Sequence, residues 1–188
     1  MLDILEVPLV RRQVVPISVA TYHAMAAQGL VDKRTELLRG VIVEKMSKSP
    51  LHASIVRRLF RLVTKAAGPN DLVLKEDPIT TIDSEPEPDV AVVAGHEDDF
   101  RCSHPQRALL VIEVAVSSIA IDREKASIYA GAGVGEFWLV LPESASIEVH
   151  TAPRDGVYAE RKIFTGGDTL LSQALPALRV SLGKLFAK

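Results

Sequence analysis

Two carboxylates stand in the two most apolar stretches of the sequence. Glu113 lies within residues 109–116, where the other seven residues are apolar, and Asp89 opens residues 89–94, where the other five are apolar. Such runs predict strands that are buried in a sheet. Burying an ionised carboxylate is costly unless a metal ion, a cationic side chain or several donors contact it. Asp89 and Glu113 are therefore candidate functional residues; the structural alternatives are a buried ion pair for Glu113 and a capping role after Pro88 for Asp89.

A lysine and a histidine occupy inward-facing positions on two predicted helices. In the helix predicted for residues 122–130, Lys125 lies at the centre of the apolar stripe with Asp122 beside it. Lysine normally extends from the edge of such a stripe, so this position calls for an explanation. His52 falls in the apolar stripe and in the first turn of a helix predicted for residues 50–67. A lone inward histidine is more often a core residue than a catalyst, which makes His52 the weaker candidate.

An aspartate and a glutamate on neighbouring strands, with a lysine nearby, form a site for a hard cation beside a positive charge. Oxygen ligands suit Mg²⁺ or Mn²⁺, which keep several waters and bind substrate phosphate. Such an ion lowers the pKa of a bound water and neutralises charge that builds on phosphorus. The sequence has neither a nucleotide-binding glycine loop nor a Gly-x-Ser-x-Gly nucleophile turn. Metal-assisted hydrolysis of a phosphodiester is therefore the chemistry that these residues predict best.

Strands and helices that follow one another along the chain have to position these side chains. The predicted strands are residues 71–82, 89–94, 109–116 (closed by Ser117 and Ser118), 136–141, 146–151 and 157–164. The other predicted elements are an extended arm at 1–17, helices at 19–28 after Ser18, at 50–67 after Ser49 and at 122–130, a hairpin at 34–46 around Arg39-Gly40, and short apolar segments at 174–186. Neither a repeat nor a linker interrupts the series, so we predict one domain over residues 1–188, of the α/β (α+β) class.

The composition is that of a globular protein with no global attraction to nucleic acid. Of the 188 residues, 47% are hydrophobic and 24% are charged, and the net charge is −2. Nucleic-acid binding would therefore need a local basic face. The helix predicted for residues 50–67 has a basic face, which consists of Arg57, Arg58, Arg61 and Lys65. The simpler interpretation of this face is a solvated surface. In the predicted hairpin, Glu36 and Glu44 are most simply solvent-facing, although either could border a site.

The single cysteine and the absence of long apolar runs indicate the cellular compartment of the protein. Cys102 cannot form an internal disulfide or a thiolate zinc cluster, and it suits a reducing compartment. Asp3 and Glu6 interrupt the first residues, which are therefore unlike a secretory leader. No apolar run approaches the ~20 residues of a membrane span. We expect a cytoplasmic protein that has no membrane partner.

Six ordered segments of the sequence resemble the Uma-two family of the PD-(D/E)XK nuclease superfamily, whose members are described as restriction endonucleases of bacteria. These segments are Thr35-Glu-Leu-Leu-Arg-Gly40, His52, Pro88-Asp-Val-Ala-Val-Val93, Ile112-Glu-Val-Ala-Val-Ser117, Asp122-Arg-Glu-Lys125 with Tyr129, and Gly133-Val-Gly-Glu-Phe-Trp-Leu-Val140. The resemblance spans roughly residues 18–186. It implies a restriction-endonuclease-like core, with a mixed central β-sheet flanked by helices. It also implies that Asp89 and Glu113 hold the metal, with Lys125 and His52 near it.

The sequence departs from the family pattern at three positions. Ala115 stands where the superfamily usually has a lysine two residues after the glutamate; Lys125, on the following helix, could reach the same place. Ser118 and Gly135 stand where prolines are common in the family. The last two changes concern the stiffness of turns rather than the chemistry.

Together these observations predict an Mg²⁺- or Mn²⁺-dependent endonuclease that acts on nucleic acid, with DNA the expected partner. Asp89 and Glu113 would bind the metal, Lys125 would position the nucleophile, and His52 would handle a proton or contact the substrate. A homodimer is a further hypothesis, because the arm at residues 1–17 has no obvious place in the core. Two alternatives stay open: a catalytically inactive nuclease-like module for nucleic-acid binding or self-association, which the 5% aromatic content favours, and a small-molecule phosphohydrolase.

Overall fold

A computed structural model describes residues 7–116 and 119–187 of the chain. Ser117 and Ser118, which were predicted to close the central strand, lie outside the described residues, as do residues 1–6 of the predicted arm.

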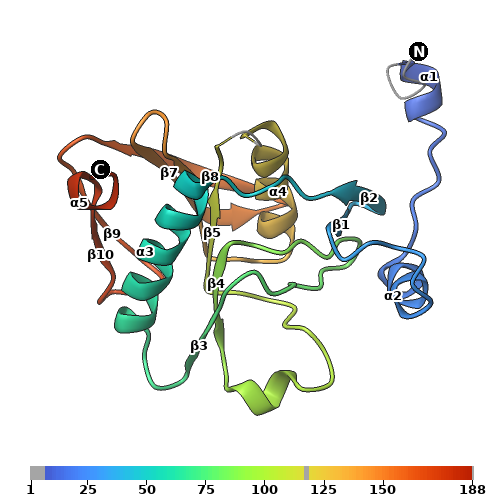
Figure 1. Ribbon diagram of the computed structural model, residues 1–188, viewed down its shortest axis with the longest axis horizontal. Coiled ribbons are helices and arrows are strands. Elements are labelled where there is room, and N and C mark those ends of the chain that lie inside the picture. Colours follow the sequence, from blue (N-terminus) through green and yellow to red (C-terminus); the bar gives the residue numbers. More distant parts are fainter. Residues whose placement is uncertain (1–6, 117–118, 188) are drawn as a thin grey trace.

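A six-stranded mixed sheet forms the centre of the molecule (Figure 1), with the strand order β3-β4-β5-β6-β7-β8. The strands are β3 (Asp71–Leu74), β4 (Val90–Ala94), β5 (Leu110–Val114), β6 (Glu136–Leu141), β7 (Ser146–Arg154) and β8 (Val157–Thr165). All neighbours are antiparallel except β5 and β6. A parallel pair needs a crossover connection, which α4 (Ile119–Gly131) supplies. The mixed sheet and its flanking helices confirm the predicted fold class.

Helices α3 (Pro50–Ala66) and α4 lie on opposite sides of this sheet (Figure 1). Side chains alternate between the two faces along a strand. On β5, Ile112 belongs to the core cluster that includes the apolar stripe of α3, whereas Val111 belongs to the cluster that includes Tyr129 of α4. Glu113 lies two residues after Val111 and therefore points to the same face of the sheet. Its carboxylate is therefore directed to the face of the sheet that α4 covers.

The capped helices and the first hairpin confirm the predictions made from local sequence. Ser18 begins α2 (Val19–Ala27), and its hydroxyl accepts a hydrogen bond from the Thr21 amide at 3.1 Å. Strands β1 (Thr35–Leu38) and β2 (Val41–Glu44) form the hairpin. Between them, Arg39 and Gly40 have φ values of 48° and 74°. Two positive φ angles give the two-residue turn that matches the twist of paired strands.

Three predicted elements need correction. The strand predicted for residues 71–82 is wrong beyond Leu74, because Glu76 has a φ of 59° and Pro78 cannot donate to a ladder. The extended arm is wrong at residues 8–11, which form the short helix α1 (Pro8–Arg11) that stands apart from the sheet (Figure 1). The strands predicted for residues 146–151 and 157–164 are longer than predicted: they pair as a hairpin whose turn consists only of Asp155 and Gly156.

The C-terminal segments complete the layer on the α3 side of the sheet. They are β9 (Thr169–Leu171), β10 (Arg179–Ser181) and α5 (Leu182–Leu185), and their buried leucines join the core cluster of α3. Within residues 7–116 and 119–187, none of the helices combines the length and the apolar character that crossing a membrane requires.

Candidate active site

Strand register places Asp89 and Glu113 side by side. Strand β4 runs antiparallel to β5, and Val90 pairs with Ile112. Continuing this register by one residue sets Asp89 opposite Glu113, and directly opposed residues project from the same face of a sheet. Asp89 and Glu113 are only 6% and 4% exposed, and both line a cavity of about 100 Å³. The two acids are therefore available to one small ligand.

Asp89 is held in place by a backbone amide of β5 and by a histidine of α3. Its Oδ2 accepts a 2.8 Å hydrogen bond from the backbone amide of Val114 and lies 3.1 Å from Nε2 of His52. His52 is fixed by the start of α3, where its amide donates to the capping hydroxyl of Ser49 at 3.2 Å. The inward position predicted for His52 thus directs its ring to Asp89. The other ring nitrogen, Nδ1, is buried and has no hydrogen-bond partner within the described residues.

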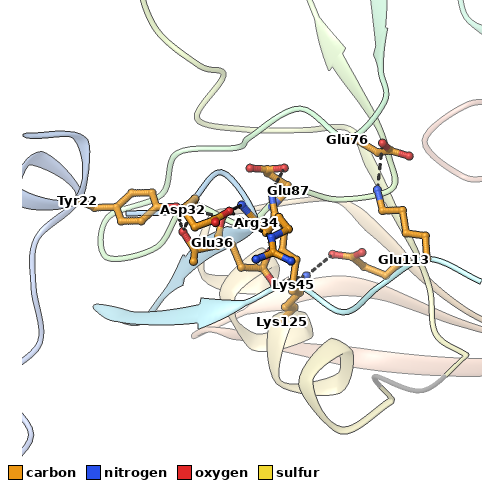
Figure 2. A network of polar contacts seen from close by, with 11 residues as sticks. Tyr22, Asp32, Arg34, Glu36, Lys45, Glu76, Glu87, Glu113 and Lys125 are labelled. Carbon is orange, nitrogen blue, oxygen red and sulfur yellow. Dashed lines mark hydrogen bonds and ion pairs between the residues drawn. The ribbon is translucent and has the colours of Figure 1, made fainter. Parts of the chain in front are cut away.

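Lys125 extends from α4 into the same cavity and meets three carboxylates, of which Figure 2 shows Glu36 and Glu113. Its Nζ lies 3.0 Å from Oε1 of Glu36, 3.2 Å from Oε1 of Glu113 and 3.8 Å from Oδ1 of Asp122. The hydroxyl of Tyr129, one turn further along α4, donates to the same Oε1 of Glu113 at 2.7 Å. The structure thus brings all four candidates of the sequence, His52 included, into one cavity. Their catalytic roles remain a prediction.

Glu36 belongs to this group, so its simpler interpretation as a solvent-facing residue was wrong, whereas the alternative, that it borders a site, agrees with the structure. It is 4% exposed, and its Oε2 accepts a hydrogen bond from the backbone amide of Glu87 at 3.2 Å. The reason is that Leu37 pairs with Glu85 in an isolated bridge, which sets the hairpin against the segment that leads to Asp89. Glu44, at the other end of the hairpin, is exposed as predicted, although it borders the cavity. The signal that could have identified Glu36 is its place in the first family-like segment, Thr35-Glu-Leu-Leu-Arg-Gly40.

These side chains form a buried group in which acids outnumber bases. We call it the acid cluster: Glu36, Asp89, Glu113 and Asp122, with Lys125 at its centre. Burial raises the pKa of Glu113 to about 8; Lys125 opposes this change, while the neighbouring acids add to it. Burial lowers the pKa of Lys125, but the surrounding carboxylates outweigh that effect and raise it. Lys125 is thus charged at neutral pH, and Glu113 retains a proton that a cation could replace.

The oxygens of the acid cluster fit a hard divalent ion. The hydrogen bonds to Asp89 use Oδ2, and the contacts to Glu113 from Lys125 and Tyr129 use Oε1. Within the described ranges, Oδ1 of Asp89 and Oε2 of Glu113 accept no hydrogen bond, so each acid keeps an oxygen for a ligand. In the same part of the chain, no three His, Cys, Asp or Glu side chains are arranged to hold a metal ion. Mg²⁺ suits a site of two carboxylates, because it usually keeps several waters and takes further oxygens from phosphate.

Comparisons with known proteins agree with this architecture. A family model described as "Putative restriction endonuclease", Uma2, matches residues 19–183. A solved structure from Anabaena variabilis, described as a putative nuclease belonging to DUF820, superposes with a TM-score of 0.76 at 18% identity. The superposition covers 92% of this chain and 98% of the other, which shows a shared restriction-endonuclease-like fold. A search of curated proteins gives no match. Because the family model spans most of the chain, this protein belongs to the Uma2 family, as the resemblance of its motifs predicted.

Proposed function

We propose that this protein is a divalent-metal-dependent endonuclease that hydrolyses phosphodiester bonds of nucleic acid, with DNA as its expected substrate. The observation that supports the proposal most directly is the acid cluster. Asp89 and Glu113 lie side by side, each keeps an oxygen that accepts no hydrogen bond from the described residues, and Lys125 stands beside them. Membership of a family described as restriction endonucleases, and the shared fold, point to the same chemistry.

In this proposal Asp89 and Glu113 would hold Mg²⁺ or Mn²⁺. When bound, the ion would lower the pKa of a water molecule and neutralise charge on the phosphate. In the reaction, the water loses a proton to the solvent and its oxygen bonds to phosphorus, while the bond from phosphorus to the leaving nucleoside oxygen breaks and that oxygen takes a proton from the solvent. Lys125 acts as a cation that stabilises the phosphate oxygens rather than as a base, because its raised pKa keeps it protonated. His52 acts through Asp89, whose carboxylate it contacts, and is therefore a positioning residue.

One observation favours a second candidate, a catalytically inactive nuclease-like module. Lys125 and Tyr129 already satisfy Oε1 of Glu113, at 3.2 Å and 2.7 Å, which resembles a structural ion pair. In such a module, however, the acids would be expected to match the bases. Here Glu36 and Asp122 also surround the single lysine. The surplus of buried carboxylates favours the metal-binding function over the inactive module.

A cleavage assay tests the proposal. Wild type with Mg²⁺ or Mn²⁺ is incubated with labelled single-stranded DNA, double-stranded DNA and RNA, beside Asp89→Asn. Loss of a metal ligand is expected to lower the cleavage rate on the order of 1000-fold, since the ion supplies several kcal/mol. The matched control is Glu148→Gln, which changes a buried acid that does not line the cavity and is expected to cleave as wild type does. Equal background cleavage by all three proteins, with and without metal, would contradict the proposal.

A further inference from the structure

The segment that joins β2 to α3 runs along the mouth of the cavity. Residues 45–49 of this segment all belong to the lining, and so do Glu76 and Glu87, which lie in the irregular segment between β3 and β4. The cavity is thus bounded by two stretches of backbone that are not part of the sheet. One of them leads into α3 and His52, and the other leads directly to Asp89.

Two ion pairs connect these stretches across the mouth. Nζ of Lys45 lies 2.7 Å from Oε2 of Glu87, and Nζ of Lys48 lies 3.0 Å from Oε2 of Glu76. Figure 2 shows Lys45 beside Glu87, with Glu36 and Lys125 close by. All four side chains of the two pairs keep contact with solvent, between 24% and 44% of their surface. Ion pairs of this kind contribute little to stability, so either lysine can exchange its carboxylate for another anion at small cost.

Such an exchange would help a negatively charged substrate to bind, because the site itself carries a surplus of negative charge. A phosphodiester that approaches the acid cluster meets a surplus of negative charge, and Lys125 is already surrounded by three carboxylates. Within the described lining, the other ammonium groups are those of Lys45 and Lys48. Each has one carboxylate within ion-pair distance in that part of the chain, and an ammonium has three N–H donors. The N-terminal end of α3, at Ser49, adds a favourable partial charge on the same side.

We propose that Lys45 and Lys48 bind the phosphates that flank the scissile phosphodiester, and that Glu87 and Glu76 occupy the two lysines when no nucleic acid is bound. This inference rests on the proposed function, because it assigns the substrate contacts of the same site. The pairing carboxylates also disfavour smaller or less charged anions, since a ligand has to replace both of them. An extended chain of phosphates can do so, whereas a single phosphate can replace only one.

Binding and cleavage measured on the same variants test the inference. Fluorescence anisotropy of labelled DNA in Ca²⁺, and cleavage in Mg²⁺, are measured for wild type, Lys45→Ala and Lys48→Ala. If a lysine contacts a phosphate, replacing it by alanine should reduce the magnitude of the slope of log K against log salt by about 1. This change corresponds to DNA binding about tenfold weaker at 0.1 M salt. The loss should appear in KM, with kcat largely kept. The control is Lys75→Ala, because Lys75 lies 3.5 Å from Glu76 but does not line the cavity; it should bind within about twofold of wild type.

A double-variant cycle separates competition from a general effect of charge. Glu87→Gln frees Lys45 and should tighten DNA binding about two- to fivefold, which corresponds to the loss of a partly exposed ion pair. In the Lys45→Ala background, the same change should have no effect, because there is no lysine left to free. Additive effects, or a Lys45→Ala variant that binds and cleaves as wild type does, would overturn the inference while leaving the proposed function intact. A wild type that neither binds nor cleaves DNA or RNA would overturn both.

Discussion

Helix α4 presents Lys125 to one group of acids and Arg123 to another. The two positions are roughly 200° apart around the helix, so the two groups occupy different sides of it. On the first side is the acid cluster. On the second side, Glu148 of β7 lies 2.8 Å from Arg123 and 2.8 Å from Arg161 of β8, with His150 at 3.6 Å. We call this second group the arginine cluster.

The two clusters have opposite effects on a buried glutamate. In the arginine cluster, burial raises the pKa of Glu148, but hydrogen bonds and charge from Arg123 and Arg161 outweigh it and lower the pKa overall. In the acid cluster, burial raises the pKa of Glu113 to about 8, and the single lysine does not compensate. An acid with more than enough basic partners is a structural element of the fold. An acid that lacks them is a site at which a cation is stabilising, and this difference distinguishes a candidate active site from an ordinary ion pair.

The largest contrast is expected when each cluster loses a base. Lys125→Met removes the ammonium that Glu36 and Glu113 contact among the described residues, and it should lower the free energy of unfolding by about 3–5 kcal/mol. Arg123→Met leaves Arg161 on Glu148 and should cost less than about 1 kcal/mol, because its ion pair is half exposed. Urea unfolding at pH 8 compares the two variants with wild type. Equal losses would mean that the acid cluster is no more unbalanced than the arginine cluster.

Proton competition at Glu113 provides the next test. A metal ion needs the carboxylate form, so the proton that Glu113 holds below a pKa of about 8 opposes binding. The affinity for Mg²⁺ should therefore rise with pH, by close to tenfold per unit well below pH 8, and level off above it. The measurement is a titration of Mg²⁺ at several values between pH 6.5 and 8.5. A constant affinity across this range would show that Glu113 is already ionised or does not hold the metal.

Two tyrosines with little exposure, one in contact with the acid cluster and one away from it, allow the effects of the same Tyr→Phe change to be compared. Tyr129 donates to Glu113 at 2.7 Å, whereas Tyr158 donates to the backbone carbonyl of Val134 at 2.9 Å. Each Tyr→Phe change should cost about 1 kcal/mol of stability. Only Tyr129→Phe should also slow cleavage, by about tenfold, because it releases a carboxylate that is held for the metal. Cleavage rates measured under single-turnover conditions separate the two, and equal rates for both variants would contradict the assignment.

The smallest effect is expected in the arginine cluster itself. Glu148 has a lowered pKa in the folded state, so its contribution is complete above the ordinary value of 4.5 and is lost as the pH falls through the lower folded value. Glu148→Gln should therefore cost less than about 1 kcal/mol at pH 7, and its cost at pH 3, below the ordinary pKa, should be smaller still. Urea unfolding at the two pH values is the measurement. A larger loss at the lower pH would contradict the sign of the shift.

Local sequence predicted most of the elements that position the site. The serine caps of α2 and α3 and the Arg39-Gly40 turn follow from interactions within a few residues, and all of them occur. The full length of β3 could not be predicted, because the departure at Glu76 depends on how residues 75–88 pack rather than on their strand propensity.

The acid cluster was predictable in part. Asp89 and Glu113 stand out because acids are rare in strands of this character, and the strand register then brings them together. Lys125 stands out because of its central place in an apolar stripe. Glu36 was allowed to border a site but was not named as a candidate residue, because its burial depends on a bridge between Leu37 and Glu85, which are 48 residues apart. The alternation of polar and apolar residues within a hairpin does not predict a contact with a distant part of the chain.

Calorimetric titration of Mn²⁺ into the protein at pH 8 tests the central claim most directly. Wild type should bind the ion saturably through Asp89 and Glu113. Glu113→Gln should abolish the binding, and Glu148→Gln, which alters the arginine cluster instead, should leave it unchanged. If wild type takes up no Mn²⁺, or if Glu113→Gln binds it as tightly as wild type, the surplus of acid around Lys125 does not form a metal site.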